Sequence, residues 1–383
     1  MTARIRLADL SAHRTIIGSE IDAAIAAVVE HGRWIMGPEV AAFEEAAQDF
    51  VGDPQIQAIG CGNGTDALLL AFQALGLGPG QAVICPSFTF VATAEAVAAL
   101  GGVPVFADVA QHGFNLGPDE ARLAHKTAVE NGLDVVGICS VDLFGAPAPH
   151  NDLAAVAAEL GCWLVSDAAQ SFGAQSGGRR VGALADVTTT SFFPAKPLGC
   201  YGDGGMVFVR DTQVADVIRS LRVHGKGTNK YDNVRIGQNS RLDTIQAAIL
   251  LAKMVIFEDE LAGRDRVAQR YATGLADAVQ VPMIDPEDRS AWAQYTVVTE
   301  DRAGLQAALS DAEIDSAVYY PRPLHRQPAY ERFHLLGTDL TRTDWLTERV
   351  ISLPMHSYLS DTDVDRVIET VREAGQREPA HGC

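Results

Sequence analysis

The stretch TTSFFPAKPLGCYGDGG, residues 189–205, holds one lysine, Lys196, between two apolar segments. Residues 187–193 are mostly β-branched and aromatic and predict a strand, and residues 206–209, beyond a glycine-rich turn, predict another. Burying an ammonium group without a partner is costly, so a lysine between two buried strands is unusual. Taken alone, the pattern also fits a surface lysine on a hairpin loop. A desolvated lysine, by contrast, has a lowered pKa and is a nucleophile that can form a Schiff base.

An acidic residue that can partner this lysine lies upstream. Residues 162–167 predict a buried parallel strand with Asp167 at its end, and ligands of open α/β sheets bind at the carboxyl ends of the strands. A carboxylate and a lysine are the pair that pyridoxal phosphate (PLP) requires, because the lysine binds the cofactor aldehyde while the carboxylate keeps the pyridine nitrogen protonated. An acidic strand end can also hold a metal or cap a helix, but Ser191 and Lys196 on the following strand and turn, together with Asp167, favour PLP.

A second motif predicts an anion site. Residues 55–59 predict a short strand, and a glycine-rich turn and an Ala/Leu-rich helix follow it. Free backbone N–H groups and the helix dipole both face such a turn, so Gly64 and Thr65 are candidates to bind a phosphate group. The alternative is an ordinary tight connection between strand and helix.

Composition narrows the class of protein. With 383 residues, 47% of them hydrophobic, the chain can build one very large domain or two ordinary ones. A net charge of −19 argues against sequence-independent binding to nucleic acid or to an anionic membrane. The cysteines form no close pair, which predicts free thiols in a reducing compartment and neither zinc nor disulfides. No signal segment or membrane span is evident, so we expect a soluble, cytoplasmic protein.

Five motifs occur in order along the chain, and together they resemble the DegT/StrS family of PLP-dependent nucleotide-sugar aminotransferases. They are GNGTDAL at 62–68, PSFTFVAT at 86–93, DAAQSFG at 167–173, SFFPAK at 191–196 and NSRLD at 239–243. The resemblance covers nearly the whole chain and implies a fold type I PLP-dependent transferase, an α/β fold with a large domain and a smaller C-terminal α+β domain.

The order of strand and helix signals fits that fold. The apolar runs predict a doubly wound, mainly parallel sheet of about seven strands, flanked by helices. These runs are 55–59, 82–86, 103–108, 135–139, 163–167, 187–192 and 206–209. We expect an N-terminal arm over 1–20, a PLP-binding large domain over 21–255 and a small domain over 256–383. Ser19 is a candidate N-cap of the first helix, strands are expected at 295–298 and 316–320 with a helix at 303–309 between them, and the tail after Arg372 is expected to fray.

The resemblance also assigns roles to cofactor-binding residues. It implies that Phe90 stacks on the pyridine ring, although its sequence context also fits a core aromatic. Gln170 is expected near the ring hydroxyl, and Ser191 at the cofactor with Gly64 and Thr65. Asn239 is expected to reach the cofactor phosphate of a neighbouring subunit, which implies a homodimer with shared active sites.

Substrate-binding candidates come from two further segments. Residues 224–239 form a polar, glycine-rich loop that is too long for a simple connector. Its basic residues, and one just beyond it, are expected to meet the substrate's diphosphate or an acidic sugar group; they are Lys226, Lys230, Arg235 and Arg241. By resemblance the sugar pocket is lined by Tyr320, His325 and His356, which otherwise would be packing or turn residues. Asp142 stands where relatives commonly carry a histidine; if that histidine touches substrate, Asp142 implies a different sugar or a different contact.

These assignments predict an enzyme that moves the amino group of L-glutamate, giving 2-oxoglutarate, onto a keto-sugar nucleotide. Segment 224–250 is most similar to members acting on UDP-linked 3-keto N-acetyl sugars or their uronic acids; a 4-keto-6-deoxy sugar is the alternative. Relatives that remove a sugar hydroxyl typically have histidine in place of the lysine, whereas position 196 is lysine. A non-catalytic, PLP-binding regulatory protein is a further alternative, against which the intact set of Asp167, Ser191 and Lys196 argues.

Overall fold

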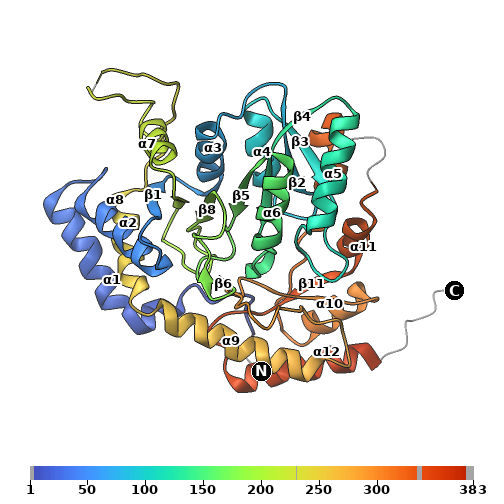
Figure 1. Cartoon of the computed structure of the whole chain (residues 1–383). Helices are drawn as coiled ribbons and strands as arrows, with labels where there is room; N and C mark the ends of the chain where they lie inside the picture. Colours follow the sequence, from blue (N-terminus) through green and yellow to red (C-terminus); the bar gives the residue numbers. More distant parts are fainter. Residues whose placement is uncertain (1–3, 230, 334–338, 377–383) are drawn as a thin grey trace.

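The computed structural model describes residues 4–229, 231–333 and 339–376. A seven-stranded sheet with helices on both faces forms its centre, and a smaller group of helices and a two-stranded sheet lies below it in the view of Figure 1. The strands of the large sheet are β1 (Gln57–Cys61), β2 (Gln81–Pro86), β3 (Val103–Ala107), β4 (Asp134–Val141), β5 (Trp163–Asp167), β8 (Val187–Ser191) and β9 (Gly205–Val209).

The strand order is β1-β9-β8-β5-β4-β2-β3. Strand β9 runs antiparallel to both of its neighbours, and the other neighbouring pairs are parallel. The predicted α/β fold with a mainly parallel sheet is therefore confirmed. Because β5 and β8 are parallel neighbours, with Asp167 paired to Thr189, their carboxyl ends place Asp167 and Ser191 at the same edge of the sheet.

Alternate residues of the strands pack against different helices. In β2, Val83 belongs to the core on one face of the sheet and Ile84 to the core on the other. This two-sided burial is why the strands read as continuous apolar runs. The first face is covered by α3 (Gly64–Ala74), α4 (Ala92–Ala99) and α7 (Thr212–Leu221), and the second by α5 (Pro118–Glu130) and α6 (His150–Leu160), with α2 (Pro38–Val51) and α8 (Thr244–Met254) packed near β1. Among the described helices, none is both long enough and apolar enough to cross a membrane.

The C-terminal part has its own core. Strands β10 (Tyr295–Val298) and β11 (Val350–Leu353) pair antiparallel, and α9 (Phe257–Leu275), α10 (Arg302–Asp311), α11 (Thr341–Arg349) and α12 (Asp361–Gln376) complete this part. The strand and helix predicted at 295–298 and 303–309 are confirmed. The strand predicted at 316–320 is wrong, because this segment makes only an isolated bridge at Ala317 and its tyrosines pack against an aromatic cluster. The proposed domain division at residue 256 stays a prediction.

The first helix begins earlier than the sequence predicted. Helix α1 runs from Ala12 to His31, so an irregular arm through residue 20 with Ser19 as N-cap is wrong. The misleading signal is a run of poor helix formers ending in Gly18, and Ile17 indeed has non-helical φ and ψ angles inside the helix. Ahead of α1, Ile5 pairs with Ile314 and is buried in the C-terminal core. Helix α12 continues through Gln376, so the prediction of fraying directly after Arg372 is wrong, and the rest of the predicted tail lies outside the described residues.

Candidate active site

Lys196 lies on the turn between β8 and β9. Its backbone N–H donates to the carbonyl of Phe193 at 2.9 Å, and the N–H of Cys200 donates to the carbonyl of Phe192 at 2.8 Å, so the turn is closed on itself. The lysine is half-buried. Burial lowers the pKa of its amine, nearby Asp167 opposes this, and the net direction is downward. More of the amine is therefore uncharged at neutral pH than in an exposed lysine.

Asp167 ends β5 and is only 5% exposed. The Thr93 hydroxyl donates to its Oδ2 at 2.7 Å, and the Ala169 N–H donates to its Oδ1 at 3.2 Å. Burial raises the pKa of Asp167, the two hydrogen bonds and the charge of Lys196 lower it, Asp142 raises it, and the net direction is upward. The protein alone thus leaves this carboxylate partly uncompensated, and a protonated ring nitrogen would stabilise its charged form.

The glycine-rich turn meets the end of β8. Helix α3 begins at Gly64, and the Asn63 side chain caps it by accepting from the Asp66 N–H at 2.8 Å. A Cβ on Gly64 would lie 2.7 Å from the Cβ of Ser191, so the close approach of these two segments requires glycine. The N–H groups of Gly64 and Thr65 and the Ser191 hydroxyl thereby form a cradle in which a phosphate group can bind.

Phe90, Tyr320 and Gln170 form another group. The Phe90 side chain is 53% exposed despite its apolar character, and its ring centroid lies 6.1 Å from that of Tyr320. Gln170 is buried; its Oε1 accepts from the Phe144 N–H at 2.7 Å, and its Nε2 donates to the Tyr320 hydroxyl at 3.3 Å. An exposed aromatic ring held beside buried polar groups suits a flat heterocycle that carries a hydroxyl.

The loop after α7 ends beside the glycine-rich turn, because the N–H of Gly62 donates to the Ser240 hydroxyl at 3.0 Å. Asn239, the preceding residue, is exposed, and its contact with a neighbouring subunit stays a prediction. Lys226 and Arg235 are exposed and Arg241 is half-buried, whereas Lys230 lies outside the described residues. Their contact with substrate stays a prediction.

The two predicted sugar-pocket histidines lie in separate polar groups. His325 is buried, with its Nδ1 2.8 Å from the Ser87 hydroxyl and its Nε2 3.3 Å from Asp344, so both ring nitrogens are engaged within the chain. His356 is buried as well, and burial, followed by the charge of Arg264, lowers its pKa to about 4. Neither group includes the lysine turn or the β5 carboxylate, so a direct role in sugar binding stays a prediction for both.

One contributor, Thr93, was not identified from the sequence, and the bonding of Asp142 was not predicted. Thr93 fixes the Asp167 carboxylate, and the only local signal was a hydroxyl in the first turn of a predicted helix. Asp142 is fully buried and accepts from His150 Nε2 at 2.8 Å, the Ala148 N–H at 2.9 Å and the Ser171 hydroxyl at 2.7 Å. All of these bonds are internal, so Asp142 ties α6 to the loop after β5, and the departure from the family pattern is explained without a sugar contact.

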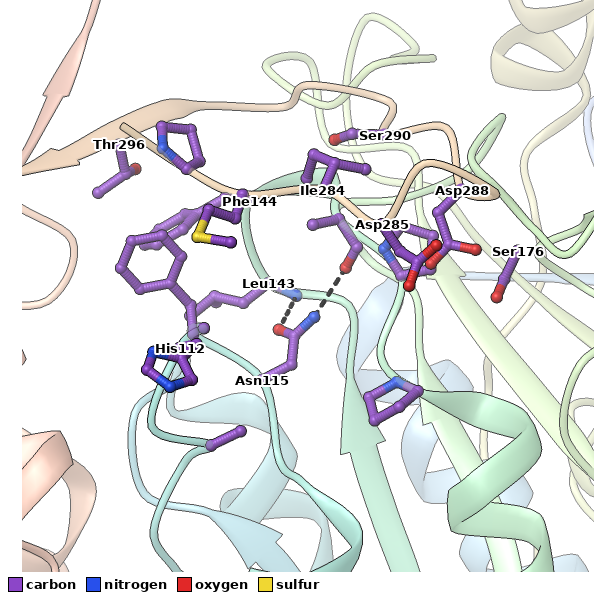
Figure 2. Close-up of a pocket in the computed structure, with 18 of the residues that line it drawn as sticks. His112, Asn115, Leu143, Phe144, Ser176, Ile284, Asp285, Asp288, Ser290 and Thr296 are labelled. Carbon is purple, nitrogen blue, oxygen red and sulfur yellow. Dashed lines mark hydrogen bonds between the residues drawn. The ribbon is translucent and has the colours of Figure 1, made fainter. Parts of the chain in front are cut away.

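A separate cavity of about 560 Å³ lies where the turn after β4 faces residues 280–296. Figure 2 shows Asn115 at its wall, with its side chain bonded to the Ala146 carbonyl and the Leu143 N–H. Phe144 lines the cavity with its side chain while its N–H donates to Gln170, so one turn separates the two spaces. The residues predicted to bind cofactor or substrate do not line this cavity.

The described groups fit PLP. A phosphate cradle at Gly64 and Ser191, an aromatic surface at Phe90, a buried carboxylate at Asp167 and a desolvated amine at Lys196 match the cofactor's phosphate, ring, ring nitrogen and aldehyde. Together with the mainly parallel seven-stranded sheet, they define a PLP-dependent transferase of fold type I. The chain belongs to the DegT/DnrJ/EryC1/StrS aminotransferase family, whose sequence model matches residues 15–372.

Three curated relatives match almost end to end. The chain is 44% identical over 365 residues to UDP-2-acetamido-2-deoxy-3-oxo-D-glucuronate aminotransferase of Pseudomonas aeruginosa, which covers 94% of this chain and 97% of the relative. It is 36% identical to dTDP-3-amino-3,4,6-trideoxy-alpha-D-glucose transaminase of Streptomyces venezuelae, with 98% and 97% covered. It is also 36% identical to UDP-N-acetyl-3-dehydro-alpha-D-glucosamine 3-aminotransferase of Acidithiobacillus ferrooxidans, with 96% and 97% covered.

Solved structures agree. A DegT DnrJ EryC1 StrS aminotransferase from Brucella abortus superposes with a TM-score of 0.95 at 46% identity, covering 97% of this chain and 100% of that one. A Bacillus subtilis protein crystallised with bound cofactor PMP, the pyridoxamine form, superposes with a TM-score of 0.88 at 27% identity, covering 98% and 86%. The predicted family, fold type and PLP cofactor are confirmed, and the chain is a PLP-dependent aminotransferase.

Proposed function

We propose that this aminotransferase moves the amino group of L-glutamate to C3 of a UDP-linked 3-keto N-acetyl sugar or its uronic acid. The observation that carries the proposal is the 44% identity, over nearly both full chains, to the Pseudomonas aeruginosa 3-oxo-glucuronate enzyme. The names of the three relatives described above place the oxo or amino group at position 3. Such a product serves the biosynthesis of amino sugars and surface polysaccharides.

Each residue of the site has its own role toward the cofactor. When bound, PLP supplies an aldehyde that accepts the amino group and a ring that withdraws electrons from the reacting carbon. Asp167, oriented by Thr93, stabilises positive charge at the ring nitrogen. Lys196 would hold the cofactor at its aldehyde carbon through Nζ, and its amine, once released by the incoming amino group, would take up a proton at Nζ and return it. Its lowered pKa supplies the free amine that general base catalysis needs. Gly64 and Ser191 bind the phosphate group.

We infer that two copies of the chain share their active sites. Large apolar side chains are exposed near the lysine turn and between α1 and α2, among them Trp34, Ile35 and Phe193. Ile35 forms a bridge to Asp243, so this loop packs beside the segment that carries exposed Asn239. Exposed apolar residues next to a functional loop are typical of a protein interface. An active, monodisperse monomer in sedimentation would contradict the shared site.

The charge and the thiols support the remaining assignments. We place the enzyme in the cytoplasm, since the five cysteines that the structure describes are all free thiols. The net charge of −19 supports small-molecule substrates rather than nucleic acid or an anionic membrane as partners. Basic residues of the loop after α7, including Lys226 and Arg235, are the proposed contacts for the diphosphate or a sugar carboxylate.

The substrate is tested most simply in reverse. Purified protein with PLP is incubated with 2-oxoglutarate and a panel of UDP-, dTDP- and GDP-linked amino sugars, and glutamate formation is measured. We expect the highest kcat/KM with UDP-linked 3-amino N-acetyl sugars or their uronic acids. Activity confined to 4-amino-6-deoxy sugars would refute the C3 assignment while leaving the aminotransferase intact.

A further inference from the structure

A buried lysine lies beside the active-site turn and has no part in the mechanism above. The five lysines of the chain are Lys126, Lys196, Lys226, Lys230 and Lys253. Lys253, near the end of α8, is 2% exposed. Its Nζ donates to the carbonyl of Gly199 at 2.6 Å and lies 4.7 Å from the centroid of the Tyr201 ring. Burying an ammonium group is costly unless it has partners, and here the Gly199 carbonyl and the Tyr201 ring are those partners.

The carbonyl that Lys253 binds belongs to the turn that carries Lys196. Gly199 is packed so tightly that a Cβ on it would lie 2.6 Å from the carbonyl oxygen of Pro194. At the next residues of the turn, the Tyr201 N–H donates to the Gln246 side chain at 2.9 Å. Gln246 and Lys253 lie seven residues apart and so occupy one face of α8. Helix α8 therefore holds two neighbouring parts of the same turn.

We propose that Lys253 is a positioning residue, which by binding the Gly199 carbonyl fixes the turn that presents the Lys196 amine to Asp167. This inference rests on the proposed role of Lys196. The bond is charge-assisted, and such bonds are roughly twice as strong as neutral ones. The turn after Lys196 is rich in glycine and would otherwise sample many conformations. A fixed turn keeps the amine half-buried, which is the condition for its lowered pKa.

The surroundings of Lys253 make its titration separable from that of its neighbours. Burial lowers the pKa of Lys253 to about 8. Glu260, facing it from α9, has a lowered pKa because hydrogen bonds and nearby charges outweigh its burial. On the turn, burial raises the pKa of Cys200 to about 11 and also raises that of Tyr201. Of these four groups, only Lys253 changes charge near pH 8.

Two measurements on the full-length, cofactor-free protein test the proposal. In Lys253→Met, we expect backbone hydrogen exchange in residues 193–205 to accelerate about ten- to a hundredfold, the bias that a charge-assisted hydrogen bond provides. The pH at which Lys196 reacts half-maximally with an amine-selective reagent, followed by peptide mass spectrometry, should also rise toward that of exposed Lys126. Lys253→Arg, which keeps a charged donor, should recover part of both effects. Lys126→Met, at a side chain that is 72% exposed, should change neither.

Unchanged exchange and an unchanged Lys196 midpoint in Lys253→Met would overturn the proposal. If the methionine variant does not fold, the pH dependence of the wild-type protein tests the proposal. Backbone hydrogen exchange of residues 193–205, corrected for intrinsic rates, should accelerate in a step above pH about 8. The Lys253→Gln variant should lack this step. A wild-type profile without the step would also overturn it. Neither readout involves a sugar, so failure here is distinct from failure of the proposed substrate.

Discussion

Replacing Thr93 by valine tests whether the Asp167 carboxylate must be held for the cofactor to bind. Valine has nearly the same shape as threonine, so the fully buried side chain keeps its packing and loses only the hydroxyl that donates to Asp167 at 2.7 Å. Since that hydrogen bond lowers the pKa of Asp167 against the effect of burial, its loss should raise the pKa further.

The expected loss of PLP affinity follows from the kind of hydrogen bond that is removed. A hydrogen bond to a charged group contributes about 1.5–3 kcal/mol, and about 1.4 kcal/mol corresponds to a tenfold change in a binding constant. If the ionised carboxylate is what the bound ring nitrogen needs, Thr93→Val should weaken PLP binding by roughly ten- to a hundredfold at neutral pH. The loss should be larger on the acid side, where the carboxyl group is more readily protonated.

The assay is a titration of cofactor-free protein with PLP, followed by cofactor absorbance. The matched control is Thr188→Val on β8, since the Thr188 hydroxyl is buried and has no hydrogen-bond partner among the described residues. The control should leave PLP affinity unchanged. Equal affinity of Thr93→Val and wild type across pH would refute the role given to this hydroxyl.

Three further predictions address other parts of the structure. Phe90→Ala should weaken PLP binding about two- to tenfold in the same titration, because an aromatic pair contributes about 0.5–1.5 kcal/mol; unchanged affinity would exclude stacking. Asp142→Ala should lower the free energy of unfolding in urea by about 3–5 kcal/mol, since it leaves buried His150 without its acceptor, and a loss below about 1 kcal/mol would contradict the structural role. Without cofactor, the Asp167→Asn variant should be more stable than wild type at neutral pH, because burial raises the folded-state pKa of Asp167. In wild type, the stability that protonated Asp167 contributes is complete below its unfolded-state pKa and is lost as pH rises through the raised folded-state pKa. The difference in unfolding free energy between Asp167→Asn and wild type should therefore shrink on acidification. A difference that stays constant with pH would refute this prediction.

Local pattern, together with the resemblance of five motifs to a known family, predicted the chemistry of this chain. Asp167 ends one strand and Lys196 follows another; both strands are buried on both faces, and such strands are visible as apolar runs of the right length. Gly64 follows a third strand and begins a helix, so the prediction of an anion-binding turn there also rests on neighbouring residues. For the same reason each of the seven predicted strands overlaps one strand of the large sheet.

The local sequence pattern did not predict contacts between segments that are distant along the chain. The bond from Thr93 to Asp167 joins residues 74 positions apart, and that from Lys253 to Gly199 joins residues 54 apart. Composition also gave a wrong prediction where packing determines the backbone conformation. The aromatic run ending in Tyr320 has the residue types of a strand, but it forms no strand, and its side chains pack against a cluster of other rings. Strand β11, by contrast, forms where it can pair with β10.

The central claim is that Lys196 is the lysine that binds PLP. Reduction of the PLP-loaded enzyme with borohydride, followed by peptide mass spectrometry, fixes the cofactor to the lysine that holds it. The account predicts a single modified peptide that contains Lys196, and none in the Lys196→Ala variant. Modification at Lys253 or at another lysine, with Lys196 unmodified, would contradict it.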